Sequence, residues 1–345
     1  MLLDSGAAAS GLSEDSVRAL GLATKGKGQL AGNGETRQTI TFVRNLTFRM
    51  GEAEFTGDPV AVIPAGDLES HEGRRIGGIL GVDLFRRYVV KVDYAARKII
   101  LYDPGSFQYQ GDGYAVPLHF KGGAALFAAS IVTAGHNRVP AEIAIDSGTY
   151  SALRLYGPFA SRHHLPVAGT KTVSSFGFGL GGEYAEVMGR VEALDIGPLS
   201  LQRPETSFST AKGGATASGA YDGTIGGAIL RRFQVTFDYP HQRLILAPDD
   251  DFADPFEVDT AGLILVAGGT DLRTISVGHV LAETPAEAAG VQPGDMLTRI
   301  NDQDAGDLGL ERIRLLFRQP GSYALQLRRG GSLVTVTMVT RRGIY

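Results

Sequence analysis

The chain has 345 residues, a net charge of −4 and a pI near 6.0, and 43% of its residues are hydrophobic. These values predict an ordinary folded protein of two or three domains, and the acidic balance argues against a nucleic-acid partner. The absence of cysteine excludes disulfides, zinc–thiolate sites and cysteine nucleophiles, and no apolar run is long enough to predict a transmembrane segment.

The first informative stretch is Asp4-Ser5-Gly6-Ala7, which directly follows two leucines. A short helix is predicted after it. Ser13 is its expected N-cap, Val17 and Leu20 are expected to face inward, and Gly21 is expected to end it.

Strands are predicted next, after a turn-prone tip. The tip runs from Gln29 to Glu35, where Asn33-Gly34 favours a tight hairpin. Apolar or alternating runs, separated by Gly and Asp turns, indicate antiparallel strands over Thr39–Val43, Leu46–Met50, Glu54–Phe55 and Val60–Ile63.

The opening phrase repeats 142 residues later as Asp146-Ser147-Gly148-Thr149, again after an apolar run. A glycine block follows each phrase, Ile79-Leu80-Gly81 in the first copy and Thr224-Ile225-Gly226 in the second. Further matched segments, such as Val92-Asp93-Tyr94 and Phe237-Asp238-Tyr239, keep nearly the same offset. Matched segments in one order indicate an internal duplication.

The second copy predicts the same order of elements as the first, with a hairpin formed by Thr172–Phe178 and Glu183–Gly189. Two β-like runs, Tyr114–Phe120 and Leu126–Ala134, precede its aspartate, and the first copy has nothing in their place. We therefore expect the start of the chain to lack about 25–30 residues of fold. If an export signal precedes that part, the protein is periplasmic or exported, and the sequence leaves its compartment open.

The composition changes after the acidic stretch Asp249–Asp254, which predicts a linker. The string Thr284-Pro285-Ala286, then Ala289-Gly290-Val291, then Pro293-Gly294-Asp295 resembles a PDZ domain of the bacterial type. The same stretch also predicts a helix over Leu310–Phe317 and paired strands over Tyr323–Leu327 and Leu333–Val339. The resemblance implies a peptide that adds a strand to the sheet edge, with its carboxylate held by backbone N–H groups near Gly262, Leu263 and Ile264.

Two aspartates brought together from equivalent loops form an acid and a base. Like charges a few Å apart cannot both ionise cheaply, so the pair holds one proton. One carboxylate can then take a proton from a water molecule while the other protonates a carbonyl oxygen, and no metal or cofactor is needed.

The paired phrases and their glycine blocks resemble the aspartic proteases of the pepsin and retropepsin type, over residues 1 to about 248. This resemblance implies that Asp4 and Asp146 are the catalytic pair. The supporting residues that it implies are Ser5, Gly6, Ser147, Gly148 and Thr149. The two turn regions become flaps over an extended peptide, at Ala31, Gly32, Asn33 and Gly34 and at Phe178, Gly179, Leu180 and Gly181. The first flap has no tyrosine, unlike that of the pepsins, so the likeness is closer to the retropepsins.

We therefore expect a mainly β fold of two pseudo-symmetric acid-protease lobes, residues 1–112 and 113–250, followed by an α+β PDZ domain over residues 251–345. The expected function is that of an aspartic-type endopeptidase with a polypeptide substrate and a PDZ domain that binds peptide. The alternative is an inactive scaffold that acts through the PDZ domain. A trypsin-like serine protease is excluded, because no serine lies in the Gly-Asp/Asn-Ser-Gly-Gly setting that this class requires.

Overall fold

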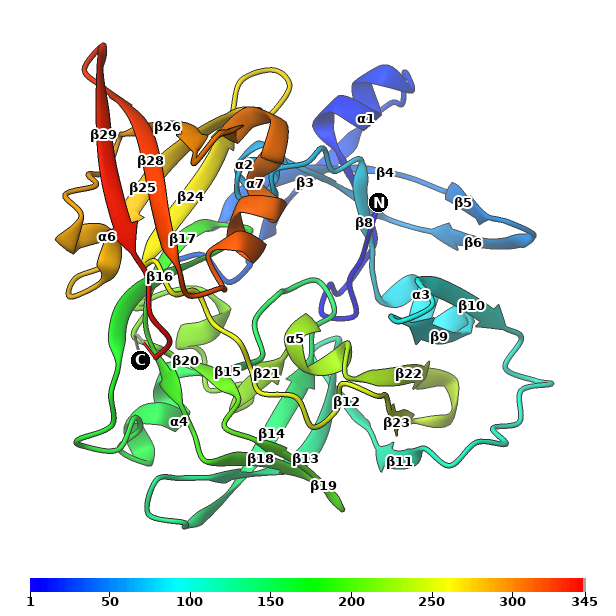
Figure 1. The fold of residues 1–345 in the computed structure, drawn as a ribbon. Helices are drawn as coiled ribbons and strands as arrows, with labels where there is room; N and C mark the ends of the chain where they lie inside the picture. Colours follow the sequence, from blue (N-terminus) through cyan, green and yellow to red (C-terminus); the bar gives the residue numbers. More distant parts are fainter. Residues whose placement is uncertain (344–345) are drawn as a thin grey trace.

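The two aspartate phrases belong to two separate sheets in the computed structural model, which describes residues 1–343 (Figure 1). The first sheet has the strand order β1-β8-β2-β7-β4-β3, and β5 and β6 form a separate pair. The strands are β1 (Leu2–Leu3), β2 (Gly11–Ser13), β3 (Lys25–Leu30), β4 (Gln38–Val43), β5 (Leu46–Met50), β6 (Ala53–Gly57), β7 (Val60–Ile63) and β8 (Gly78–Leu80). The helices of this part are α1 (Glu14–Ala19), α2 (Gly66–Glu72) and α3 (Val82–Arg87).

The second sheet is larger, with the order β16-β17-β20-β15-β21-β14-β13-β18-β19, and β12 pairs with β13. Its strands are β12 (His119–Lys121), β13 (Ala124–Val132), β14 (Arg138–Ile145), β15 (Leu153–Leu155), β16 (Val173–Gly179), β17 (Gly182–Arg190), β18 (Ala193–Ile196), β19 (Leu199–Gln202), β20 (Glu205–Ser209) and β21 (Gly223–Ile225). Its helices are α4 (Gly157–Arg162), α5 (Gly227–Leu230) and the 3₁₀ turn η1 (Ala215–Ala217).

The same parallel pairing carries both phrases, as a duplicated chain predicts. Strand β1 pairs in parallel with β8, and β14 pairs in parallel with β21. Strand β14 also pairs with β13, whereas β1 lies at the edge of its sheet. The aspartate of each copy therefore leaves the end of a strand that is held by the glycine block of its own copy.

A third sheet joins the two copies, with the order β10-β9-β22-β23-β11. Its strands are β9 (Val89–Asp93), β10 (Lys98–Tyr102), β11 (Tyr114–Pro117), β22 (Phe233–Asp238) and β23 (Arg243–Pro248), and the 3₁₀ turn η2 (Tyr239–His241) links the last two. Strand β9 of the first copy pairs with β22 of the second, and the Phe85 and Phe237 rings meet at 5.0 Å in a common core. This shared core fixes the two copies relative to each other.

The C-terminal part has its own sheet, β24-β25-β26-β28-β29, with β27 beside β26. The elements are β24 (Leu263–Gly268), β25 (Thr274–Val280), β26 (Met296–Ile300), β27 (Gln303–Asp304), β28 (Ser322–Arg329), β29 (Ser332–Val339), α6 (Pro285–Ala288) and α7 (Ala305–Leu316). A separate apolar core, which includes Leu265, Ile275, Leu297 and Leu325, makes this part a domain of its own. Together with the sheets before it, this gives the mainly β class that the sequence predicts.

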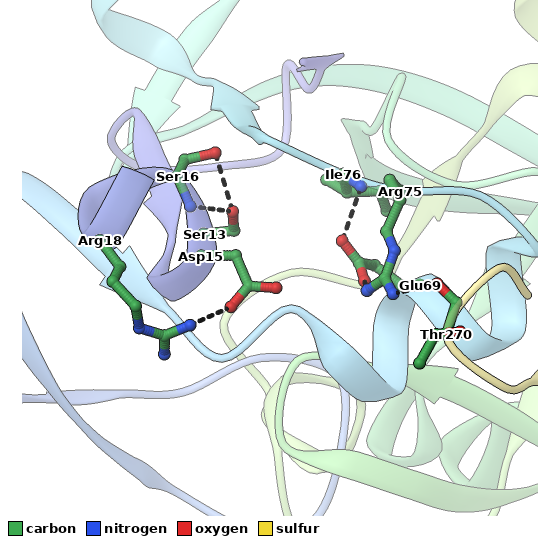
Figure 2. A network of polar contacts seen from close by, with 8 residues as sticks. All are labelled: Ser13, Asp15, Ser16, Arg18, Glu69, Arg75, Ile76 and Thr270. Atoms are coloured by element: carbon green, nitrogen blue, oxygen red, sulfur yellow. Dashed lines mark hydrogen bonds and ion pairs between the residues drawn. The ribbon is translucent and has the colours of Figure 1, made fainter. Parts of the chain in front are cut away.

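Two local predictions are wrong, while one cap is confirmed. The Ser13 side chain accepts from Ser16 N at 3.1 Å and caps α1, as Figure 2 shows. Leu20, however, is 64% exposed, because α1 is so short that only Val17 faces inward. Strands β3 and β4 are not joined by a tight turn at Asn33-Gly34, because β3 ends at Leu30 and β4 begins at Gln38.

Among residues 1–343, no helix combines the length and the apolar character needed to cross a membrane.

Candidate active site

The glycine blocks hold both aspartate loops in the same way, through one backbone hydrogen bond to each aspartate. The Asp4 backbone N–H donates to Leu80 O at 2.9 Å, and the Asp146 N–H donates to Ile225 O at 3.0 Å. A Cβ at Gly81 would lie 2.6 Å from Ala9 C. The equivalent Cβ at Gly226 would lie 2.5 Å from a backbone oxygen of its own loop. Only glycine lets the backbone of each block pass this close to the aspartate loop, so the two blocks fix the positions of the aspartates.

The serines after the aspartates bind the two loops to each other. Ser5 N donates to Ser147 Oγ at 2.9 Å, and Ser147 N donates to Ser5 Oγ at 3.0 Å. The hydroxyls then donate onward to the strands before the opposite loop, Ser5 Oγ to Ile145 O at 3.1 Å and Ser147 Oγ to Leu3 O at 2.9 Å. These four hydrogen bonds are symmetric. They bring together the loops of Asp4 and Asp146, the pair that the resemblance implies. Thr149 does not join it, since its hydroxyl lies 3.3 Å from Ser151 Oγ within its own loop.

The carboxyl groups face each other across the glycines that follow them. A Cβ built on Gly148 would lie 2.5 Å from Asp4 Cγ, and one built on Gly6 would lie 2.9 Å from Asp146 Cγ. Each glycine therefore makes room for the opposite carboxyl. Asp4 Oδ1 also accepts from Gly6 N and Ala7 N, at 2.9 and 3.0 Å, and Asp146 Oδ1 accepts from Gly148 N at 3.0 Å.

The surroundings give the two carboxyls different proton affinities. Removal from water and the neighbouring Asp146 charge raise the pKa of Asp4 to about 8. Removal from water also raises the pKa of Asp146, but the nearby Arg154 guanidinium opposes the rise. Such a pair releases its protons in two separate steps, so one proton stays on it across a wide range of pH.

The residues predicted as flaps lie at the tips of two hairpins, β3–β4 and β16–β17, and these tips touch. Gly34 N donates to Leu180 O at 3.1 Å, and Thr36 N donates to Gly181 O at 3.1 Å. The tips are packed so closely that a Cβ on Gly32 would lie 2.1 Å from Leu180 O. The hairpins β3–β4 and β16–β17 are therefore joined in the closed arrangement.

Sequence reasoning missed Arg154, which lies eight residues after Asp146 on β15. Its side chain is only 5% exposed and lies 5.4 Å above the Tyr184 ring of β17. Nearby on β17, Glu186 is 7% exposed and accepts from Ser207 Oγ at 2.6 Å. The signal was present in the sequence, since Leu153-Arg154-Leu155 places a charge inside an apolar run.

Two family models match parts of this chain. Residues 1–84 match the family model of an aspartyl protease, and residues 262–328 match that of a PDZ domain. The chain carries an aspartyl protease domain and a PDZ domain. No protein of curated function matches its sequence.

Two solved structures are similar at low scores. One is a retropepsin-like aspartic protease from Rickettsia conorii, 14% identical, with a TM-score of 0.29 over 40% of this chain and all of that chain. The other is an HtrA-type protease with a decapeptide, 12% identical, with a TM-score of 0.24 over 69% of this chain and 61% of that one. Neither score carries an argument about this chain.

The predicted peptide-binding residues of the PDZ domain lie at the start of β24, an edge strand of its sheet. Gly262 N, together with Ala261 N, donates to Asp259 Oδ1 at 2.6 and 2.8 Å, so an internal carboxylate already holds this loop.

Helix α2 of the protease domain packs against β24, as Figure 1 shows. The Gly73 backbone at the end of α2 reaches α7, where a Cβ would lie 2.6 Å from Leu310 Cβ. The sheet edge that a peptide would extend is thus covered.

One polar contact crosses the same interface, since Arg75 Nη2 donates to Thr270 O of the PDZ domain at 2.7 Å (Figure 2). Glu69 of α2 positions this arginine by accepting from Arg75 Nη1 at 2.6 Å, and it also accepts from Ile76 N at 2.8 Å. Within the PDZ domain, Arg314 Nη2 of α7 donates to Leu265 O of β24 at 3.1 Å.

Hairpin β16–β17 is held by a histidine on each side. His71 of α2 stacks on Phe178 at 3.7 Å, and His279 of β25 stacks on Phe176 at 4.2 Å. His279 Nε2 also lies 2.9 Å from Glu183 Oε2. Hairpin β16–β17 therefore contacts both the PDZ domain and helix α2, which packs against β24.

Proposed function

We propose that the protein is an aspartic-type endopeptidase in which Asp4 and Asp146 activate water. The observation that supports this most directly is the convergence of two equivalent carboxyls, held by the reciprocal Ser5–Ser147 hydrogen bonds. In this proposal residues 1–112 and 113–250 are the two lobes of the protease and residues 251–345 are the PDZ domain.

The chemistry follows from one proton on two carboxyls. The ionised carboxylate takes a proton from a water molecule held between them, and the water oxygen attacks the scissile carbonyl carbon. The protonated carboxyl gives its proton to the carbonyl oxygen at the same time. Closure of the flaps excludes bulk water and holds the peptide extended over the pair.

The PDZ domain supplies peptide binding, and we propose that it controls the second flap. A peptide that adds a strand to β24 must displace α2 from it. Since α2 and β25 also hold hairpin β16–β17 through His71 and His279, peptide binding and flap opening are coupled. The alternative function, a scaffold that only binds peptide, keeps this contact but assigns no role to the Asp pair.

The test is the replacement of each aspartate by asparagine, which removes the titrating group and keeps the shape. Asp4→Asn and Asp146→Asn should each lower cleavage of a fluorogenic peptide library by about 10²–10⁴-fold with an unchanged circular dichroism spectrum. Asp15→Asn, on the exposed side of α1, is the control and should cleave normally.

Full cleavage by the Asp4→Asn/Asp146→Asn double variant would remove the aspartic mechanism. Peptide binding by a wild-type chain that cleaves nothing in the library would favour the scaffold.

A further inference from the structure

Arg154 of the second lobe is a buried cation, and its charge opposes the rise in the pKa of Asp146. Arg154 Nε and Nη1 have no hydrogen-bond partner among the described residues, although the side chain is 95% buried, as its 5% exposure shows. Its strand β15 pairs with β21, where Arg154 lies opposite Thr224. The next residue of β21, Ile225, accepts the Asp146 N–H. A buried charge that makes so few hydrogen bonds is costly unless a nearby anion compensates it.

The first copy has no buried arginine or lysine at the equivalent position, as the strand registers show. Arg154 pairs with Thr224 on one side and Ser207 on the other. In the first copy the equivalent residue of β2 is Gly11, which pairs with Ile79 and Ala61. A polar position in the second lobe thus corresponds to a glycine between apolar residues in the first. The duplicated fold is symmetric in its backbone and asymmetric in its charge.

The groups that face Arg154 come from every element packed around it. Tyr184 and Glu186 belong to β17, Tyr156 precedes α4, and Tyr221 precedes β21, with its hydroxyl 3.2 Å from that of Tyr156. Glu205 lies on β20, and its charge raises the pKa of Glu186. Burial lowers the pKa of Arg154, whereas Tyr184, Glu186 and Asp146, a member of the proposed catalytic pair, raise it.

We infer that Arg154 is a positioning residue that places the negative charge of the pair on Asp146 and leaves the proton on Asp4. The inference rests on the proposed function and assigns a direction to its chemistry. Asp146 takes one proton from water, the hydroxide oxygen bonds the carbonyl carbon, and the Asp4 proton moves to the carbonyl oxygen. When the C–N bond breaks, the nitrogen receives the proton from Asp146 and the hydroxyl returns its own to Asp4.

The electrostatic surroundings agree with this direction. Arg154 opposes the rise in the pKa of Asp146, whereas burial and the charge of Asp146 both raise the pKa of Asp4. Burial also raises the pKa of Glu186, and Arg154 opposes this rise as well. Removing Arg154 or Glu186 should therefore act on the pair in opposite directions.

The first experiment is the pH profile of kcat/KM for three variants. Arg154→Met removes the cation, so the acid limb should move up by about one pH unit. Arg154→Lys should restore most of the wild-type profile. Glu186→Gln frees Arg154 to act on Asp146, so the acid limb should move down. Arg232→Met is the control for loss of a buried arginine, because Arg232 binds carbonyls of residues 251–255.

Shifts of opposite sign support the inference, because simple damage to the lobe would not produce them. An unchanged acid limb in Arg154→Met or Glu186→Gln overturns it. If Arg154→Met does not fold, Glu186→Gln decides alone.

The second experiment does not need activity. Carboxyl carbon NMR titration of Asp4→Asn reports Asp146 alone, and titration of Asp146→Asn reports Asp4 alone. The remaining carboxyl should titrate at lower pH in Asp4→Asn than in Asp146→Asn, and adding Arg154→Met should reduce the gap. An equal or reversed order overturns the inference even if the peptidase is active. If Asp146 titrates at lower pH than Asp4 but the wild-type chain cleaves nothing, the proposed function is overturned and the inference about Arg154 stands.

Discussion

At the scale of single residues, the glycine after each aspartate is required by what faces it. A side chain at Gly148 would occupy the position of the Asp4 carboxyl, at 2.5 Å from its Cγ. The local phrase therefore has a reason that lies in the opposite lobe, 142 residues away in sequence. The serines show the same dependence, since each hydroxyl accepts from the backbone of its twin.

Gly148→Ala tests this contact. The added methyl should push the Asp4 carboxyl aside, and a misplacement of about 1 Å lowers activity by about 10²-fold. Overpacking should also lower the free energy of unfolding by about 1–3 kcal/mol, measured by denaturant titration. The control is Gly219→Ala, since a Cβ there meets nothing within 4 Å in the part of the chain that the structure describes. Normal turnover by Gly148→Ala would contradict the facing arrangement.

At the scale of elements, hairpins β3–β4 and β16–β17, the proposed flaps, depend on each other because their tips share hydrogen bonds. Gly181 O accepts both from Thr36 N at 3.1 Å and from Thr36 Oγ1 at 2.6 Å. Near its tip each hairpin is a two-stranded ribbon, because β4 pairs with β7 only through residues 41–43 and β17 pairs with β20 only through residues 186–190. A two-stranded ribbon by itself is marginal in water. The contact between the tips therefore stabilises both in the closed arrangement.

Thr36→Val removes the hydroxyl and keeps the shape of the side chain. One lost hydrogen bond of about 1 kcal/mol should speed amide hydrogen exchange of Gly34 and Thr36 by about fivefold. Thr36→Ser keeps the hydroxyl and should exchange at nearly the wild-type rate. Equal exchange in the two variants would show that the Thr36 hydroxyl does not hold the tips together.

At the scale of the whole molecule, the PDZ domain is packed against the machinery that it is proposed to control. Helix α2 covers β24, and His279 of β25 stacks on Phe176 and pairs with Glu183 of the second flap. A ligand of the PDZ domain can therefore act on the flap through contacts and needs no long-range path.

His279→Ala should loosen hairpin β16–β17 and leave the PDZ domain folded. We expect faster hydrogen exchange over residues 173–190 and a two- to fivefold change in the relative kcat/KM of long substrates, with a smaller change for a short peptide. His119→Ala is the matched control, because His119 also lies 2.9 Å from a glutamate, Glu142, of its own sheet. Equal changes for long and short substrates would count against control by the PDZ domain.

Local patterns predicted much of this molecule because they are local in origin. The α1 cap, strands β4, β5 and β7 and the last strand pair, β28 and β29, follow from capping and from the strand pattern. The duplication indicated that two aspartates occupy equivalent loops. The errors arose where the surroundings decide, since a six-residue helix leaves Leu20 in water and the residues between β3 and β4 hydrogen-bond to the β16–β17 hairpin.

The sequence by itself determined the kind of fold and the presence of two equivalent aspartate loops, because strand periodicity and internal repetition can be seen along the chain without the tertiary structure. Only the tertiary structure decided which carboxyl has the rise in its pKa opposed by a buried cation, that the flap tips meet, and that α2 covers β24. The physical reason is that charge, desolvation and contact between distant segments depend on distances in space, and those distances exist only after the lobes have packed.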